Sequence, residues 1–346
     1  MAQTKVTSAE VAALAGVSQS AVSRVFTPGA SASPKTVEKV KKAATELGYR
    51  PNALARAVVS GRSRIIGLVV AYLENHFYPD ALEKLSNALK ARGYHVLVFM
   101  ASKTAGNIDA VVDEILDYQV DGIVMASVAM SSTIVERCQA AGVPVVLFNR
   151  YEAEHSGVSA VTSDNETGGR KVAEFLLAGG HQRIGHIAGW EGASTQRDRE
   201  RGFLATLEAA GRTLHAREVG DFNLDRACDA ARRMFGHADP PDAVFVANDH
   251  MAFVVMDVIR YEIGLSVPDD VSIVGYDDVP LASWLAYDLT TVRQRANLMV
   301  DETVAALIAH IESPETTSPR RVSIDGPLIV RGSARVPDGW NEKEST

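Results

Sequence analysis

Residues 64–340 alternate strand-like apolar runs with amphipathic helical stretches, and this alternation limits the folds open to the chain more than any other feature. The rhythm begins at RIIGLVVA, starts again at GGRKVAEFLLAGG and reaches VSIVGYDD. A repeated strand–helix order predicts parallel sheets flanked by helices. Two similar halves in sequence predict two lobes with a cleft between them. Between these points the apolar runs are YHVLVFM, VDGIVMA, VPVVLFN and VFVAND.

Polar and aromatic residues gather just after the predicted strands. Ligands of parallel α/β sheets bind beyond the carboxyl ends of the strands, so these exits form a candidate binding site. Asparagine, aspartate and arginine beside flat rings suit a sugar, because they pair with its hydroxyls and cover its C–H face. Taken singly, each is better explained as a helix cap or a core aromatic, and Asp249 and Asp278 are expected to be caps. Convergence at five exits supports the ligand site: Asn75, Phe77, Tyr78, Asn149, Arg150, Arg199, Asn248, Asp249, Asp277 and Asp278.

Charge is spread unevenly along the chain. The 346 residues carry a formal net charge of −8. Residues 1–64 hold ten Lys and Arg against three Glu, a balance of +7, which leaves −15 on the remainder. A basic segment on an acidic body is typical of a polyanion-binding module joined to another domain, although a solvated charged surface is the alternative.

Three short helices are predicted in the basic segment. Thr7 begins the first as the N-cap of a T-x-x-E capping box, and Gly16 permits a left-handed turn at its end. Ser18 caps a second helix over residues 19–26, and Ser33 caps a third that has proline at its first position. A tight turn between the first two helices makes this a helix-turn-helix unit.

The second helix has an apolar side and a polar side. Val22, Val25 and Phe26 form the inward side. Glutamine can pair with adenine and arginine with guanine in the major groove, while hydroxyls and helix amino ends can hold phosphates. A small helical bundle with a polar face is the alternative, and the charge asymmetry favours DNA. The outward residues are Gln19, Ser20, Ser23 and Arg24.

The segments VTSAEVAALAGVSQSAVSRVF and SPKTVEKVKKAATELGYRPNALAR closely resemble the head of the lactose-repressor/galactose-repressor (LacI/GalR) family. The resemblance implies that Gln19, Ser20 and Arg24 read base edges. It also assigns a hinge helix from Asn52 to Val59 that inserts one apolar side chain in the minor groove; Val58 stands where most members have leucine. The residues implied to hold phosphates are Thr7, Ser18, Ser33, Lys35 and Thr36.

The segments VPVVLFNR, RDRERGF, VFVANDHMAFVVM and LTTVRQ resemble the effector-binding body of the same family, which is two-lobed and periplasmic-binding-protein-like. The resemblance places Asn149 and Gln294 near the crossing between lobes, and we expect Arg197 and Arg201 to form surface or inter-lobe ion pairs. The implied effector contacts are Asn75, Phe77, Tyr78, Arg199, Phe222, Asn248 and Asp277. The implied domains are a helix-turn-helix domain (1–50), a hinge helix and linker (51–63), an effector-binding and dimerisation domain (64–340) and a tail (341–346).

The resemblance implies a DNA-binding transcriptional regulator, most simply a repressor whose operator affinity is controlled by a sugar or sugar acid. A homodimer would match a near-palindromic operator, and no leucine heptads follow GPLIVRGSARV to join dimers. An activator would use the same contacts. A transport-type sugar-binding protein is a weaker alternative, because it predicts a signal peptide and no basic head.

A sugar-acting enzyme is the remaining alternative. No nucleophile elbow, Walker loop or zinc-protease motif follows a strand, and His181 and His186 are expected to be structural. Cys138 and Cys228 lack metal-ligand spacing. We therefore expect no catalysis, cofactor or metal. The apolar runs are too short to span a bilayer, so we expect no membrane association and a cytoplasmic location.

Overall fold

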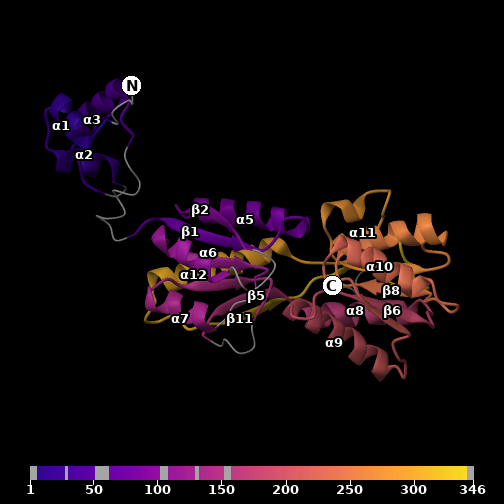
Figure 1. Ribbon diagram of the computed structural model, residues 1–346. Coiled ribbons are helices and arrows are strands. Elements are labelled where there is room, and N and C mark those ends of the chain that lie inside the picture. Colours follow the sequence, from indigo (N-terminus) through magenta and orange to yellow (C-terminus); the bar gives the residue numbers. More distant parts are fainter. Residues whose placement is uncertain are drawn as a thin grey trace. The chain divides into compact units, whose positions relative to one another are not determined.

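The chain forms two compact units, Met1–Arg64 and Ile65–Thr346, in the computed structural model (Figure 1). The structure describes residues 6–27, 30–50, 62–101, 108–128, 132–151 and 157–340. The predicted hinge, with Asn52 and Val58, lies outside these residues. Within the described ranges, no helix is both long and apolar enough to cross a membrane.

The first unit contains three helices, α1 (Ser8–Ala15), α2 (Gln19–Phe26) and α3 (Pro34–Leu47). Each begins at the hydroxyl residue that the sequence predicts. The Thr7 and Glu10 side chains form the complete capping box, and Gly16 takes a left-handed conformation with φ 64°. These ends fix the short turn between α1 and α2, because each satisfies backbone groups that a helix terminus leaves unpaired.

A small apolar core holds these helices together. Val11, Val22 and Val40, one from each helix, are fully buried. The Phe26 ring packs against Tyr49 with their centroids 5.9 Å apart. Burial of one side of α2 in this core leaves its other side on the surface.

The first lobe of the second unit is a parallel sheet covered on both faces. Its strand order is β11-β5-β4-β3-β1-β2. Helices α5 (Phe77–Ala91) and α12 (Ala296–Glu312) share a core with one face, and α6 (Ile108–Asp117) and α7 (Ser132–Ala140) with the other. The strands are β1 (Ile65–Val70), β2 (His95–Met100), β3 (Gly122–Ala126), β4 (Val145–Phe148), β5 (Ser159–Ser163) and β11 (Arg321–Ile324).

The second lobe repeats this three-layer arrangement with the order β12-β10-β9-β8-β6-β7. Its only antiparallel pairing among the described strands joins β12 (Leu328–Ile329) to β10 (Thr290–Arg293). Helices α8 (Asn165–Ala178) and α9 (Ser194–Ala209) cover one face, and α10 (Leu224–Phe235) and α11 (Asp249–Asp257) cover the other. The remaining elements are β6 (Ile184–Ala188), β7 (Ala216–Val219), β8 (Ala243–Val246), β9 (Ser272–Asp277), the π-helix η2 (Val258–Ile263) and the 3-10 helix η3 (Pro280–Ser283).

The repeated strand–helix order predicted that each lobe is one consecutive half of the sequence. The structure shows that this is not so. The chain crosses between them three times: from β5 to α8, from β10 to α12 and from β11 to β12. Helix α12 and strand β11 therefore complete the first lobe, although they follow most of the second lobe in sequence. The crossings place the ends of several strands beside the junction between the lobes.

Helices α8 and α9 approach each other unusually closely at Gly169. A Cβ atom added to this glycine would lie 2.0 Å from the backbone oxygen of Arg199 on α9. No real Cβ tolerates such a contact, so glycine is required where the helices cross. This packing fixes the position of Arg199 at the lobe junction.

Candidate functional site

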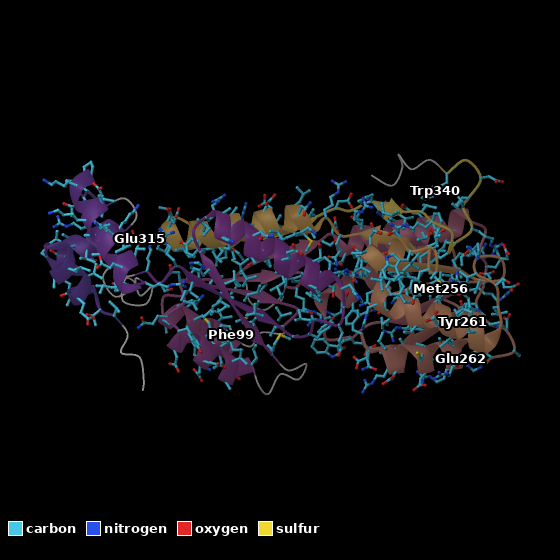
Figure 2. All side chains as sticks on the ribbon, turned by 90° about the horizontal axis from the view of Figure 1, so that it is seen from above. Phe99, Met256, Tyr261, Glu262, Glu315 and Trp340 are labelled. Carbon is cyan, nitrogen blue, oxygen red and sulfur yellow. The ribbon has the colours of Figure 1, made fainter. Side chains whose placement is uncertain are left out.

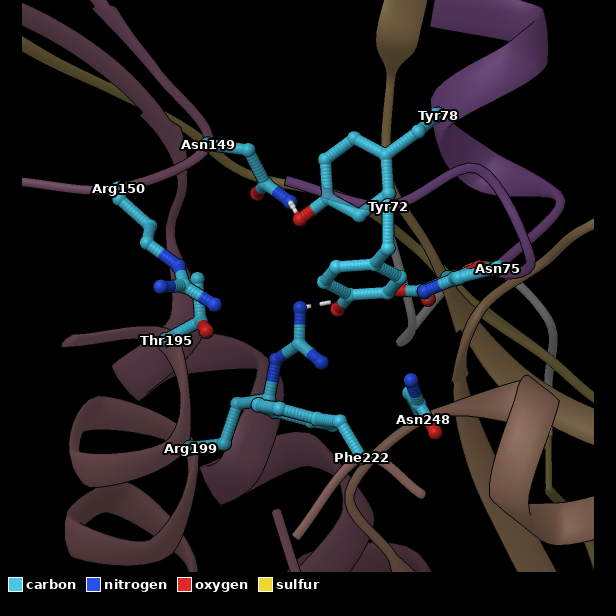
Figure 3. A pocket seen from close by; sticks show the side chains of 10 residues that line it. Tyr72, Asn75, Tyr78, Asn149, Arg150, Thr195, Arg199, Phe222 and Asn248 are labelled. Carbon is cyan, nitrogen blue, oxygen red and sulfur yellow. Dashed lines mark hydrogen bonds and ion pairs between the residues drawn. The ribbon is translucent and has the colours of Figure 1, made fainter. Parts of the chain in front are cut away.

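A polar pocket lies between the two lobes, at the carboxyl ends of their strands (Figure 3). Side chains of both lobes line it. Nine of the ten lining residues carry a polar side-chain group, and Phe222 adds an apolar ring. The lining residues are Tyr72, Asn75, Tyr78, Asn149, Arg150, Thr195, Arg199, Phe222, Asn248 and Asp277.

Asp277 is the centre of the hydrogen bonds in this pocket. Its carboxylate accepts from Asn75 Nδ2 of the first lobe at 3.2 Å and from Gln294 Nε2 at 2.7 Å. Arg199 Nη2 lies 3.4 Å away. Burial raises the pKa of Asp277, and the Arg199 charge and these hydrogen bonds oppose the rise. Through the bond to Asn75, the buried Asp277 carboxylate links the second lobe to the first.

Arg199 is held rigidly by its own partners. Its Nε donates to Asn165 Oδ1 at 2.9 Å and its Nη1 to the Ala247 oxygen at 2.6 Å. The guanidinium carbon lies 3.7 Å from the centre of the Tyr276 ring. A planar cation fixed in this way can present its remaining N–H edge to a ligand in one orientation.

The first-lobe wall is made by aromatic and amide side chains. Asn149 Nδ2 donates to the Tyr78 hydroxyl at 3.2 Å, and the edge of the Tyr72 ring meets the Tyr78 ring. Phe77 does not line the pocket, contrary to the prediction. Its ring is buried in the core and stacks on Phe148, because the first turn of α5 directs residues 77 and 78 to different sides.

The second-lobe wall depends on the ring of Phe222. This residue has φ 53°, and its ring covers Gly189 so closely that an added Cβ there would lie 2.2 Å from the ring. Asn248 caps α11 by accepting from the Met251 N–H. The capping bond leaves the amide nitrogen of Asn248 pointing toward the pocket (Figure 3).

Strained backbone collects around the pocket. Asn149, Phe222 and Asp277 all have positive φ, at 60°, 53° and 127°. Non-glycine residues adopt such angles rarely, and clusters of them are found at ligand and active sites. The strand exits are therefore shaped to direct side chains into the junction rather than to continue regular structure.

The structure thus brings together seven of the predicted effector residues: Asn75, Tyr78, Asn149, Arg199, Phe222, Asn248 and Asp277. Gln294 lies behind them and orients Asp277. Tyr72, Arg150 and Thr195 also line the pocket. Arg150 was one of the strand-exit residues of the predicted ligand site, although the resemblance assigned it no effector contact; Tyr72 and Thr195 were not predicted. Tyr72 and Arg150 directly follow strand-like runs and so carried a signal, whereas a threonine at the start of a helix carries none.

Two predicted caps have other roles. Asp249 accepts from Thr291 Oγ1 at 2.6 Å and from the Val279 N–H at 3.0 Å, while its neighbour Asn248 caps α11. Burial and the nearby Asp277 charge raise the pKa of Asp249 to about 7. Asp278 forms ion pairs with two arginines, Arg293 and Arg331. The cap predictions for Asp249 and Asp278 were therefore wrong.

The flanking arginines of α9 behave differently from each other. Arg201 forms the predicted ion pairs, with Glu166 and Asp198. Arg197 instead donates to the backbone oxygens of Glu191 and Gly192, so the ion-pair prediction for it was wrong. These two hydrogen bonds hold the loop that precedes α9 against the first turns of that helix.

The two histidines have partners typical of a structural role. His186 is buried, bonds the Phe245 oxygen and stacks on the Phe245 ring, and burial lowers its pKa to about 4. Arg335 Nη2 and His181 Nδ1 lie 2.9 Å apart. No group of three potential metal ligands occurs in the described part of the chain.

A second polar contact joins the lobes outside the pocket, and we call it the Asp198 latch. Asp198 of α9 accepts from the Tyr151 hydroxyl at 2.9 Å and lies 3.6 Å from Arg321 of the first lobe. The Arg321 guanidinium stacks on the Tyr151 ring at 3.2 Å. The Asp198 latch therefore links α9 of the second lobe to Tyr151 and Arg321 of the first lobe.

The first unit presents the polar side of α2 to the surface. Gln19, Ser20, Ser23 and Arg24 are all exposed around the buried Val22. Gln19 Nε2 donates to Ser8 Oγ at 2.8 Å, which orients the amide, and Arg24 Nε lies 3.4 Å from the Ser20 oxygen.

The residues predicted to hold phosphates lie mainly at helix amino ends. Thr7, Ser18 and Ser33 are the N-caps of the three helices, so their hydroxyls accept backbone N–H groups. Lys35 is exposed and Thr36 is half-buried in the first turn of α3. Helix amino ends attract anions, so this placement is compatible with phosphate contacts.

A helix-turn-helix unit with an exposed polar helix, joined to a two-lobed body with a polar pocket, defines a ligand-responsive DNA-binding regulator. Residues 7–52 match the model of bacterial regulatory proteins of the lacI family, and residues 173–334 match a periplasmic binding protein-like domain. The HTH-type transcriptional regulator CelR of Thermobifida fusca is 35% identical over 333 residues, which cover 93% of this chain and 96% of CelR. The chain belongs to the lacI family, as its sequence predicted.

Solved structures agree with this assignment. The Lac repressor dimer bound to operator and the anti-inducer ONPF is 28% identical, with a TM-score of 0.86 over 95% of this chain and 99% of that one. A complex of CelR with cellobiose is 33% identical, with a TM-score of 0.72 over 95% and 100% of the two chains. The predicted fold, a helical head followed by a two-lobed α/β body, is confirmed, and the chain is a transcriptional regulator rather than an enzyme.

Proposed function

We propose that this protein is a repressor that binds a near-palindromic operator as a homodimer and whose operator affinity is set by a small carbohydrate-type effector. The observation that carries the proposal is the exposed polar face of α2 on a unit with excess positive charge. In the proposed complex, Gln19, Ser20 and Arg24 contact base edges, and Lys35 contacts phosphate. This DNA-bound role places the protein in the cytoplasm.

Exposed apolar residues of the body support the dimer. Met100, 50% exposed, lies with Val98 on β2, the edge strand of the first sheet. On the second lobe, Tyr261 stands on the surface (Figure 2), and Leu285 is 98% exposed beside Trp284. Large apolar groups and an open sheet edge in each lobe favour coverage by a partner. A second copy is the occupant we propose, since the related Lac repressor was solved as a dimer on operator.

The inter-lobe pocket is the proposed effector site. Its amide, carboxylate and guanidinium groups can pair with adjacent hydroxyls, and Phe222, Tyr72 and Tyr78 can cover C–H faces. Ligand pockets typically place a few precisely positioned polar groups among apolar and aromatic walls, and the lining here combines both kinds of group. The related CelR was solved with cellobiose, which supports the carbohydrate class.

Coupling between the two sites follows from thermodynamic linkage. An effector that binds the closed lobes better than the open lobes shifts the population toward closure. If operator affinity differs between these states, the operator changes effector affinity by the same factor. An effector that lowers operator affinity is an inducer, and one that raises operator affinity is a corepressor.

Selection from a random duplex library tests the DNA-binding half of the proposal. The purified full chain should enrich a near-palindromic site, and fluorescence anisotropy on that site should change when the effector is added. A shuffled duplex of the same composition is the control. Equal affinity for both duplexes at all salt concentrations would contradict sequence-specific binding.

A further inference from the structure

Arg150 carries a buried charge that faces the pocket, and no residue in the described part of the chain supplies its counter-charge. Only 6% of the residue is exposed, and its side chain points into the pocket beside Thr195 (Figure 3). Its Nε atom has no hydrogen-bond partner, and no described residue forms an ion pair with it. Its guanidinium carbon lies 5.2 Å from the centre of the Trp190 ring. A buried cation that no described carboxylate pairs with is unfavourable, so this position favours a bound anion.

The other arginine of the pocket is already compensated. Arg199 lies 3.4 Å from Asp277, which also receives hydrogen bonds from Asn75 and Gln294. Two arginines and one aspartate among the ten lining residues leave one excess positive charge. That excess is located at Arg150, on the opposite lobe from Asp277.

The amino end of α9 lies on the same side of the pocket. Thr195, the second residue of α9, lines the pocket and is buried. The N-cap is Ala193, and no side chain caps this helix. An uncapped helix amino end carries partial positive charge and N–H groups that favour an anion. The Arg150 guanidinium and the first turn of α9 can therefore bind the same negatively charged group.

We propose that the effector is a sugar acid rather than a neutral sugar. Its carboxylate binds Arg150 and the amino end of α9, and its hydroxyls bind Asn75, Asn248 and Asp277 on the other side of the pocket. A single carboxylate matches the single excess charge, whereas a phosphate ester would bring nearly two negative charges. This inference rests on the proposed function, in which the pocket holds the effector.

Calorimetric titration of the full chain with matched ligands tests this assignment. The panel pairs gluconate with glucose, galactonate with galactose, and glucuronate and galacturonate with the same two hexoses; glucose 6-phosphate is included. At least one acid should bind at least about tenfold more tightly than its neutral counterpart. In Arg150→Gln its affinity should fall about 10- to 100-fold, the range for a lost charge-assisted hydrogen bond. Arg170→Gln, which removes an exposed arginine paired with Glu174 on α8, should bind the acid normally.

The ligand-free protein provides a second measurement. Arg150→Met removes the uncompensated charge and keeps most of the volume, so the melting temperature should rise by about 2–4 °C. A lower melting temperature would mean that the guanidinium is satisfied without an anion, and would overturn the proposal. Arg150→Lys should keep part of the acid affinity, because it retains the charge but not the two-pronged geometry.

Three binding results would also overturn the proposal: tighter binding of a neutral sugar than of every acid, tighter binding of the phosphate ester, or binding of no acid in the panel. Operator anisotropy in the same preparations separates these results from failure of the proposed function. If a neutral sugar or the phosphate ester changes operator affinity, the effector-controlled repressor stands and the sugar acid alone is wrong. If the selected operator is not bound at all, the proposed function itself fails.

Discussion

Gly169 offers a direct test of how the fold positions the pocket. In Gly169→Ala, the new Cβ would lie 2.0 Å from the Arg199 oxygen, whereas 3.0 Å is the closest approach that real Cβ atoms show. The obstacle is backbone, so no side-chain rotation relieves it. Helices α8 and α9 must separate by about 1 Å at this level. That separation loosens the buried apolar cluster to which α8 contributes Phe175 and α9 contributes Phe203.

Two opposing effects set the expected magnitude. Overpacking of a rigid core costs about 1–3 kcal/mol, and a backbone obstacle places this site at the upper end. Replacing glycine by alanine inside a helix raises the free energy of unfolding by about 1 kcal/mol, because alanine has the higher helix propensity. The steric cost exceeds the gain in helix propensity, which leaves a net loss of about 2 kcal/mol. At about 2–4 °C per kcal/mol, the melting temperature should fall by about 4–8 °C.

Thermal and urea denaturation measure this loss, and Gly157→Ala is the matched control. A Cβ at Gly157 meets only the flexible end of the Gln139 side chain at 3.3 Å, so its effect on stability should be small. Because Arg199 moves with α9, Gly169→Ala should also weaken effector binding. A Gly169→Ala protein as stable as the wild type would show that the helices separate at no cost, and would refute the reasoning.

The remaining predictions concern DNA reading, lobe closure and pH. Arg24→Ala should weaken operator binding by about 1–3 kcal/mol and relax base preference at one position, whereas Lys35→Ala should weaken all duplexes alike, both measured by anisotropy. Asp198→Asn should lower effector affinity up to about fivefold in calorimetry, because the ion pair with half-exposed Arg321 of the other lobe contributes at most about 1 kcal/mol. Between about pH 4 and 7, folded Asp249 retains a proton that the unfolded chain releases, so the free energy of unfolding should decrease as pH rises. Asp249→Asn should make that slope less negative in urea titrations.

Each of these predictions has its own contradicting outcome. Equal losses on operator and shuffled duplex in both DNA variants would remove the distinction between reading and positioning residues. Unchanged effector affinity in Asp198→Asn, with Glu208→Gln on the same helix as control, would show that the Asp198 latch does not favour closure. For the pH series, the comparison isolates one carboxyl, because His186 contributes equally to both proteins; parallel curves would mean that Asp249 is ionised throughout.

Local signals predicted the head and much of the pocket. Thr7, Ser18 and Ser33 begin their helices as expected, because a hydroxyl that caps a helix acts within one turn of chain. The strand exits led to the lining residues such as Asn248 and Asp277, since parallel strands end at a common edge. These inferences depend only on periodicity and on residues close in sequence.

The features that the sequence did not predict depend on contacts between residues far apart in the chain. The return of α12 and β11 to the first lobe depends on the pairing of short strands such as β5. The β5 sequence, SAVTS, has little hydrophobic pattern, so this pairing could not be predicted. Phe77 and Tyr78 are equally plausible pocket residues in sequence, and only the direction of the first turn of α5 separates them. Arg150 follows a strand as visibly as Asn149, but only the folded structure shows that its buried Nε atom lacks a hydrogen-bond partner among the described residues.

The three crossings also govern how the body can be made and inherited. The first sheet receives its sixth strand only when β11, which begins at Arg321, has been synthesised. The second sheet receives β12 four residues after β11 ends at Ile324. Both lobes thus reach completion together, as the last of the body leaves the ribosome. Recombination between related genes can exchange the first unit as a module. A recombination point within the body, between β6 and β11, would instead combine strands from two parents in both sheets.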